Sequence, residues 1–281
     1  MSRFLPIIFC LSLSCTAFSQ AKDTAATQEQ THFVVSATYN SGLNYYGRVD
    51  SLHSKGFYPA IGLILKNGLY ATSTFVFIQN SLVNQYAATL IEGGYNFNNK
   101  RNTWAGNLSA SRYFYQTDVS LIQSAVKEVV SGSLTSMNKV VNVTVGANVK
   151  WSGNTDIGIQ AGLDHIIKFQ RIFTKDKDVI VLDPTVNVFA GTQNFTKTYY
   201  QKKDFLLFPV SEEQVTTNSR QFNLLSYELS LPIVYGYKKL NLIFTPAYVL
   251  PQHLLTVPDQ PALSERGSNL FYLTATAKFT L

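Results

Sequence analysis

The sequence has few charged residues and almost no cysteine. Aspartate, glutamate, lysine and arginine make up 14% of its 281 residues, whereas soluble globular domains carry about 25%. The two cysteines, Cys10 and Cys15, both lie near the N-terminus, so the rest of the chain has no disulfide to stabilise it. The net charge is +6 without a long basic run, which argues against nucleic-acid binding. We therefore expect much of the surface to face something other than water.

The motifs of nucleotide, metal and nucleophilic sites are also absent. The sequence contains no GxxxxGK(S/T), HExxH, GxSxG or CxxC motif. Its histidines, His32, His53, His165 and His253, fall in separate segments without metal-ligand spacing. We therefore predict that the protein is not an enzyme and that it has no catalytic residue, no metal site and no cofactor.

No apolar run is long enough to cross a membrane as a helix, which takes about 20 residues. The apolar run Phe4–Cys15 is shorter, follows Arg3, and precedes the small-x-small sequence Ala17-Phe18-Ser19. This pattern predicts a signal peptide over residues 1–19, with an N-terminal membrane anchor as the alternative. Residues 20–31 are polar and aperiodic, and we expect them to form a flexible periplasmic tail.

Polar and apolar residues alternate from residue 32 to the end of the chain. In the segment 140–151, Val141, Val143 and Val145 fall on one side, and Asn142 and Thr144 fall on the other. Strand side chains point alternately to opposite faces, so the pattern indicates two-faced strands. We predict 12 strands, at 32–45, 56–66, 68–79, 83–97, 103–115, 118–131, 139–151, 155–171, 179–192, 221–236, 239–250 and 269–281. The sixth is the least regular, because its residues 124–130 also fit a helical turn.

The connections and faces of these strands favour a membrane barrel over a soluble sandwich. Short connections, such as Lys66-Asn67-Gly68, 98–102, 133–138, 174–178 and Lys238-Lys239, alternate with a set that includes the long loops 46–55, 193–220 and 251–268. An even-stranded barrel with both termini in the periplasm has this asymmetry. Aromatic residues gather at strand ends, where lipid headgroups would lie. Hydrocarbon cannot hydrogen-bond a strand edge, so the sheet must close. We predict an all-β fold: a closed, antiparallel, up-and-down transmembrane β-barrel over residues 32–281.

The last strand resembles a known targeting signal. Residues Phe271–Leu281 alternate and carry Phe279 in the apolar phase. The segment resembles the C-terminal insertion signal of bacterial outer-membrane β-barrel proteins, although it ends in Leu281 rather than in an aromatic residue. The resemblance implies a Gram-negative outer membrane, and insertion by the barrel assembly machinery.

Charged residues in the polar phase are candidates for the lumen. We expect the following side chains to line it: Arg112, Lys150, Asp164, Lys168, Asp183, Glu228 and Lys278. They could form a charged eyelet that selects solutes, or a salt-bridge network that plugs a narrow barrel. The loop 193–220 contains the apolar run Phe205, Leu206, Leu207 and Phe208. We predict that this run folds into the barrel mouth as a constriction, with stacking on the rim or contact with a partner as alternatives.

The function predicted from these features is that of a passive, porin-like channel for small solutes, with a slight anion preference from the net positive charge. One alternative is a closed structural or adhesive barrel without transport. The other is a membrane-embedded enzyme acting on lipid, which would need a serine beside His165. The expected partners are outer-membrane lipids, the assembly machinery and small solutes.

Overall fold

A computed structural model describes residues 30–49, 53–116, 126–152, 154–170, 172–173, 178–194, 221–254 and 267–281. The predicted signal peptide and nearly all of the predicted tail lie outside these residues. Within them, the chain forms 17 strands, labelled β1 to β17 in chain order. In the described part of the chain, no helix is long and apolar enough to cross a membrane.

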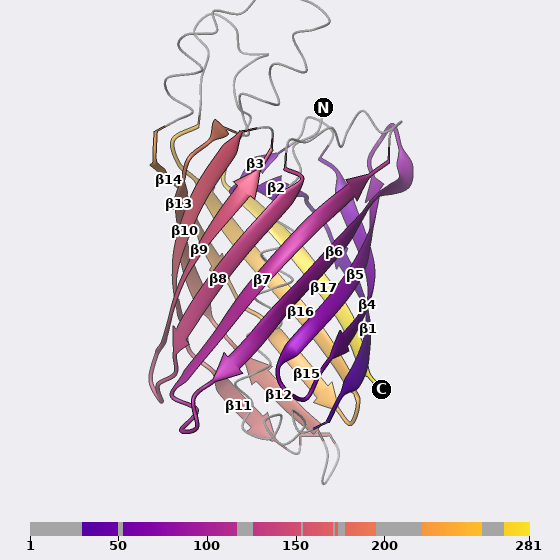
Figure 1. Cartoon of the computed structure of the whole chain (residues 1–281), viewed down its shortest axis with the longest axis vertical. Coiled ribbons are helices and arrows are strands. Elements are labelled where there is room, and N and C mark those ends of the chain that lie inside the picture. The colour runs from indigo at the N-terminus through magenta and orange to yellow at the C-terminus, as the bar shows by residue number, and fades with distance from the viewer. Residues whose placement is uncertain are drawn as a thin grey trace, which may run out of the picture.

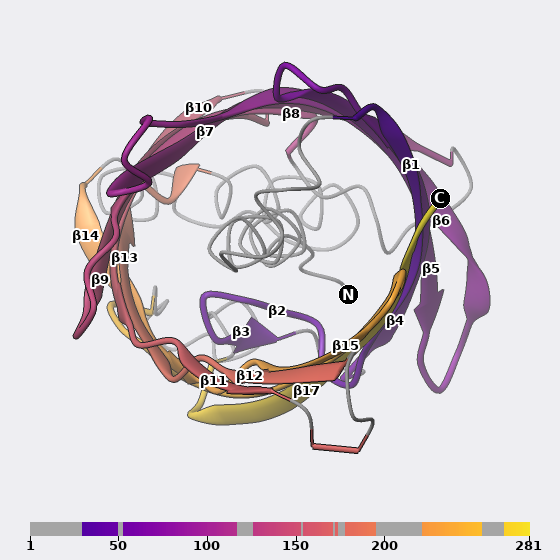
Figure 2. The same ribbon diagram turned by 90° about the horizontal axis from the view of Figure 1, so that it is seen from below.

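The strands form a closed antiparallel barrel with 12 spans, as the sequence predicts. Nine spans are single strands: β1 (His32–Asn40), β4 (Lys55–Ile64), β5 (Leu69–Gln79), β6 (Asn84–Asn98), β7 (Trp104–Tyr115), β8 (Glu128–Ser136), β9 (Asn142–Trp151), β16 (Leu240–Pro251) and β17 (Leu270–Thr280). Consecutive spans pair with each other, and β17 pairs with both β16 and β1, which closes the sheet. The strands are tilted against the barrel axis (Figures 1 and 2).

Three neighbouring spans are interrupted near prolines. They are β10 (Thr155–Asp164) with β11 (Ile167–Gln170), β12 (Asp178–Leu182) with β13 (Thr185–Gly191), and β14 (Asn223–Ser230) with β15 (Ile233–Tyr237). Proline has no N–H to donate to a strand ladder. The carbonyls of Pro184 and Pro232 still accept bonds from His165 N at 3.3 Å and Asp183 N at 3.0 Å. The wall is therefore continuous through the interruptions.

The two ends of the barrel differ in their connections. The turns that contain Lys66, Lys100, Lys139 and Lys238 lie at one end, and the start of β1 pairs there with the end of β17 through Val34 and Thr280. The segments 192–222 and 252–269 connect spans at the other end. In a barrel with an even number of strands, the end with short turns and both termini faces the periplasm.

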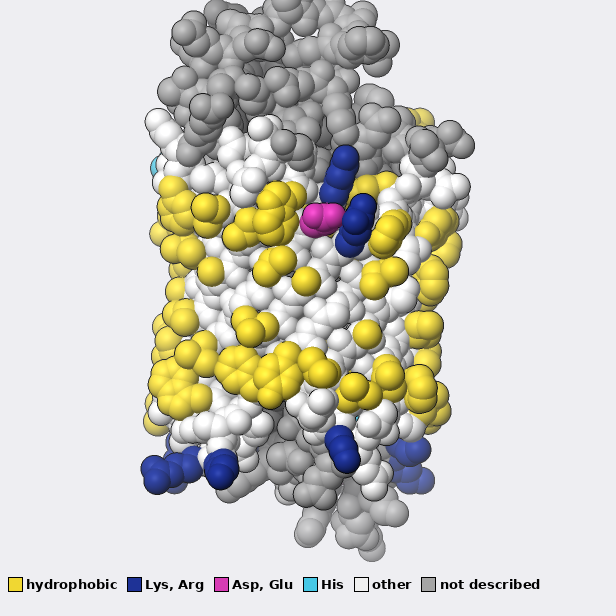
Figure 3. All heavy atoms as spheres, viewed as in Figure 1, with side chains coloured by type: hydrophobic (Ala, Val, Ile, Leu, Met, Phe, Trp, Pro, Cys, Tyr) yellow, Lys and Arg dark blue, Asp and Glu magenta, His cyan; other side chains and the backbone are white. Residues whose placement is uncertain are grey.

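The polarity of the barrel is inside-out, as the alternation predicts. On β9, outward-facing Val143 and Val145 are 41% and 51% exposed, whereas inward-facing Asn142 and Asn148 are 4% and 6% exposed. Hydrophobic side chains gather in two bands on the outer wall (Figure 3). Trp151, at the extracellular end of β9, and Trp104, at the periplasmic end of β7, are both exposed. The apolar surface with aromatic bands is that of a membrane-spanning wall.

A lysine on this wall tests the polarity. Replacing Val145 with lysine puts a charge on the outward face, and we expect a loss of about 2–4 kcal/mol of stability. The matched change Thr144→Lys puts the same charge on the lumen face, where water can solvate it, and we expect it to cost far less. Urea unfolding of the refolded protein in lipid vesicles measures both. Equal losses would contradict the inside-out assignment.

Two of the predicted strands are misplaced. The sixth, expected at 118–131, is β8 and runs over Glu128–Ser136 instead, so residues 133–136 belong to a strand rather than a turn. Small residues on both faces of Ser131–Ser136 hid its alternation. The first, expected to reach residue 45, ends at Asn40. The chain then turns away from the wall.

Candidate functional site

The segment after β1 folds into the barrel rather than outward as a loop. Its short strands β2 (Asn44–Tyr45) and β3 (Arg48–Val49) pair with each other inside the wall, towards the extracellular end (Figures 1 and 2). We call residues 41–49 the inner hairpin. Its turn residues Tyr46 and Gly47 have φ values of 53° and 77°, which is the pattern of a type I′ hairpin turn. A Cβ on Gly47 would lie 2.8 Å from the Pro251 side chain, so only glycine fits this turn.

Arg48 joins the inner hairpin to the far wall. Its Nη1 donates to the carbonyl oxygens of Tyr46 and Leu225, both at 3.2 Å. Its Nη2 donates to Gln252 O at 3.0 Å and more weakly to His253 O and Gln193 Oε1, both at 3.4 Å. The side chain is 1% exposed. A guanidinium can be buried in this way because most of its donors find acceptors.

Lys150 clamps the hairpin from β9. Its Nζ donates to the hydroxyls of Tyr45 and Tyr46, each at 2.8 Å, and lies 5.0 and 4.9 Å from their ring centroids. The Tyr46 ring also packs against Phe189 of β13, with 5.3 Å between centroids. Burial raises the pKa of the Tyr45 phenol, so this phenol stays protonated. The structure places Lys150 on the inward face of β9, where it binds the hairpin instead of standing in an open eyelet.

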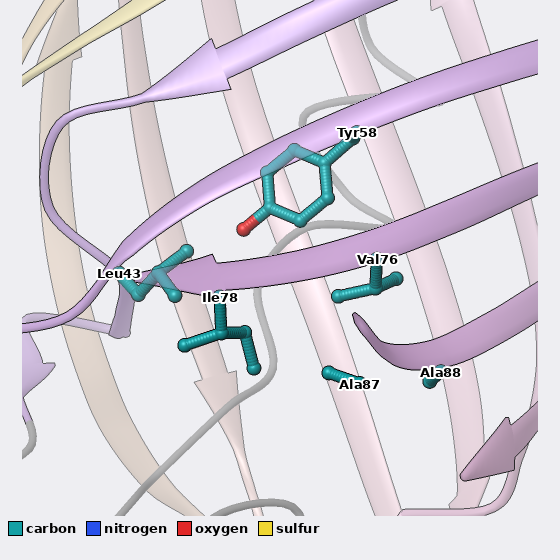
Figure 4. Close-up of a cluster of buried hydrophobic side chains, with 6 residues drawn as sticks. All are labelled: Leu43, Tyr58, Val76, Ile78, Ala87 and Ala88. Atoms are coloured by element: carbon teal, nitrogen blue, oxygen red, sulfur yellow. The ribbon is translucent and has the colours of Figure 1, made fainter. Parts of the chain in front are cut away.

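Apolar side chains fill the space between the hairpin and the wall. One cluster consists of Leu43, Tyr58, Val76, Ile78, Ala87 and Ala88 (Figure 4). A second consists of Tyr45, Leu90, Tyr113, Val126 and Val129. One feature of the sequence indicates that these clusters form, although the strand assignment did not use it. In Phe75–Ile78 both faces of β5 are apolar, since Phe75 faces outward and Val76 and Ile78 pack inside.

Among the other predicted lumen residues, Asp164 and Asp183 interact with each other, and no ring forms among those described. Asp164 accepts a hydrogen bond from Asn142 Nδ2 at 2.6 Å, and Glu228 accepts one from the Tyr272 hydroxyl at 2.9 Å. Asp183 is 7% exposed. Lys168 and Lys278 are in the inward phase, as the pairings Lys168–Val181 and Ser36–Lys278 place them. A further group was missed by the sequence argument: Glu92 accepts from the Tyr70 hydroxyl at 3.0 Å, and Asn107 Nδ2 donates to that hydroxyl at 3.1 Å.

Arg112 was expected in the lumen and lies on the outer wall. Ser111 and Tyr113 take the inward phase of β7, which leaves Arg112 outward with 63% of its side chain exposed. It forms an ion pair with Glu128 at 3.3 Å and lies 5.4 Å from the Phe114 ring centroid. The pair lies near the extracellular end of the wall, where β7 ends and β8 begins. Near the headgroups a paired charge costs little compared with the middle of a bilayer.

The expected constriction at Phe205, Leu206, Leu207 and Phe208 lies outside the described residues. The inner hairpin occupies the mouth from a different part of the chain. The positive charge that predicted anion preference is also located elsewhere. Acidic Glu92, Asp156, Asp164, Asp183 and Glu228 are all inward alongside the lysines. Several exposed basic residues lie instead on the periplasmic turns.

These features define the class of protein: a transmembrane β-barrel of the bacterial outer membrane, with a segment of its own chain folded into the lumen. No protein-family model matches the sequence, and no curated protein matches it. Among solved structures, a KdgM porin is similar over 88% of this chain and 99% of its own, at 9% identity and a TM-score of 0.46. An outer-membrane channel from Pseudomonas putida F1 is similar over 90% and 96%, at 8% identity and a TM-score of 0.47. LpxR from Salmonella typhimurium is similar over 88% and 99%, at 11% identity and a TM-score of 0.45.

Proposed function

We propose that the protein is a passive channel for small polar solutes, narrowed near its extracellular mouth by the inner hairpin. The observation that carries the proposal is the hairpin itself. It is held across the interior by Arg48 on one side and by Lys150 on the other. Away from the hairpin, many inward side chains are polar, although Val234 and Ile243 are apolar and buried there.

Much of the lumen wall offers hydrogen-bonding groups. Neighbouring strands present Ser109 to Ser131, Thr135 to Thr144 and Thr38 to Thr276, each hydroxyl pair at 2.8 Å. Some inward polar atoms have no protein partner, including Asn148 Oδ1, Gln160 Oε1 and Thr274 Oγ1. Buried polar atoms are normally satisfied by protein or by ordered water. Water and polar solutes are therefore the natural contents of this part of the barrel.

A closed structural barrel is the second candidate, and the tight packing of the hairpin favours it. The apolar clusters around Leu43 and Tyr45 resemble a protein core more than a pore lining. Single-channel recording separates the two functions. We expect the refolded protein to conduct in planar bilayers and to discriminate little between potassium and chloride, because inward acids accompany the lysines. Permanent absence of conductance in a heat-modifiable, folded sample would favour the closed barrel.

Catalysis on lipid has no support around His165. A ring nitrogen of this histidine bonds the carbonyl of Val140. The outward residues that flank the same span are Val143 on β9 and Val186 on β13, and neither carries a nucleophile. We therefore propose a non-catalytic protein that is inserted, as its last strand implies, by the barrel assembly machinery.

A further inference from the structure

The described turns at the periplasmic end carry a ring of exposed basic side chains. The members are Lys66, Lys100, Arg101, Lys139, Lys238 and Lys239. The turn sequences 65–68, 99–103, 137–141 and 238–239 contain no aspartate or glutamate. Lysines and arginines form a row along the lower edge of the barrel, just beyond the lower hydrophobic band (Figure 3). We call these six residues the basic ring.

The basic ring lies at the height of lipid headgroups. Trp104 begins β7 three residues after Arg101, and it is 45% exposed on the outer wall. Phe33 and Phe279, at the same end of β1 and β17, are 60% and 42% exposed. Exposed aromatic side chains of a membrane protein mark the interface between hydrocarbon and headgroups. Charges that follow within a few residues therefore stand beside the headgroup phosphates.

Turn geometry does not explain these basic residues. Lys238 has a φ of 52° in a two-residue hairpin turn, a position where asparagine or glycine is normally favoured. In the turn 99–103, Asn99 makes the holding contacts: its Oδ1 accepts from Thr103 N at 2.8 Å and from Trp104 N at 3.2 Å. A neutral polar residue would stabilise these turns equally well or better. The positive charges are therefore explained by a binding partner outside the chain.

We propose that the basic ring binds the phosphate groups of anionic phospholipids in the periplasmic leaflet. A lysine or arginine near a membrane surface attracts anionic lipid with about 1 kcal/mol. The described extracellular rim has fewer exposed basic residues, Lys55, Arg112 and Lys127, and Arg112 is paired with Glu128. The partner is a lipid rather than a periplasmic polymer because the turns are short, so their side chains end at headgroup depth.

The two tryptophans provide a separate probe for each rim. The sequence contains only two, and Trp104 and Trp151 lie at opposite ends of the wall. In Trp151→Phe the remaining fluorescence reports the periplasmic rim, and in Trp104→Phe it reports the extracellular rim. Each variant is refolded into phosphatidylcholine vesicles that contain brominated phosphatidylglycerol or, for comparison, brominated phosphatidylcholine. Bromine quenches a tryptophan only at contact, so the ratio of the two quenching efficiencies gives the local lipid preference.

We expect brominated phosphatidylglycerol to be preferred at Trp104 by about fivefold, the factor that corresponds to about 1 kcal/mol, and not to be preferred at Trp151. Adding Lys100→Gln, Arg101→Gln and Lys139→Gln should bring the preference at Trp104 close to one. Replacing Lys55 and Lys127, exposed at the opposite end, with glutamine is the control and should leave Trp104 unchanged. Should the triple variant fail to refold, 0.5 M salt must lower the preference of the parent protein instead. Equal quenching by both lipids at Trp104, or equal preference at both tryptophans, would overturn the proposal.

Discussion

Replacing the inner hairpin by a tight turn is expected to raise the single-channel conductance several-fold. The register of β1 and β4 defines the replacement, because Asn40 pairs with Gly56. Ser41 and Lys55 then stand opposite each other, and the dipeptide Asn-Gly in place of residues 42–54 closes a two-residue hairpin of type I′. The wall keeps all the strand pairs of its large sheet, since β2 and β3 pair with each other and otherwise make only an isolated bridge from Arg48 to Gly267.

The physical reason is that conductance depends on the narrowest cross-section. The variant removes Leu43, Tyr45 and Arg48 from the interior and opens the apolar cluster around Tyr58 to water. This exposure lowers stability, by about 25 cal/mol for each Å² of apolar surface, but leaves the hydrogen-bonded wall intact. The matched control is Leu43→Ala, which removes packing and keeps the hairpin in place. Its conductance should equal that of the parent protein.

Three outcomes of the recording are distinct. A larger conductance in the shortened variant alone supports the hairpin as the constriction. Equal conductance of parent and shortened variant, with both shown to be folded by heat-modifiable migration, would mean that the hairpin does not limit flow. No conductance from either would contradict the channel function and leave the closed barrel.

The barrel could be predicted from the sequence because its determinant is local and repeated. Each span shows its two faces within about ten residues, as β9 does with Val143, Val145, Asn142 and Asn148. The sheet must then close, because the hydrocarbon of the membrane offers no hydrogen-bond partner to an exposed strand edge. Errors arose where the local pattern was weak. In β8 glycine and serine occupy both faces, and in β7 the aromatic residues that follow Arg112 occupy both faces and hid its phase.

The interior could not be predicted in the same way, because it depends on contacts between distant parts of the chain. Arg48 and its acceptor Gln252 are separated by 204 residues, and Lys150 is 105 residues from Tyr45. A local pattern of polar and apolar residues does not indicate which distant residues form such a contact. Gly47 and the stretch of β5 that is apolar on both faces were local signs of a packed interior. Neither sign indicates which residues it packs against. Lumen charges were therefore assigned to an eyelet, although Lys150 binds the hairpin.

Arg48 is expected to be the residue on which docking of the inner hairpin depends most. Its substitution by methionine keeps much of the length and removes all five donors. The carbonyls of Leu225 and Gln252 then lose a charged partner, and an unsatisfied buried acceptor costs about 1–3 kcal/mol. The chain can avoid this cost by releasing the hairpin into water. We therefore expect the opening of the hairpin to become more frequent while the wall stays folded.

A single cysteine measures that opening. Ser54 is fully buried, and its carbonyl accepts from Leu43 N at 2.8 Å at the base of the hairpin. Because both natural cysteines lie in the predicted signal peptide, Ser54→Cys introduces the one thiol of the mature chain. In the Arg48→Met background we expect this thiol to react with a maleimide about 100-fold faster, which corresponds to about 2.7 kcal/mol of lost docking energy.

The substitution Arg48→Lys shows whether the positive charge alone, or the shape of the guanidinium group, keeps the hairpin docked. Arg48→Lys keeps the positive charge but offers a compact ammonium, which cannot span acceptors on the hairpin, Leu225 and Gln252 at once. We expect its labelling rate to fall between those of the parent and the methionine variant, with a more frequently open channel in recordings. If thiol labelling in Arg48→Met were as slow as in the parent, packing of the Leu43 and Tyr45 clusters would be sufficient for docking. The hairpin would then be a fixed part of the wall rather than a segment that one side chain holds in place.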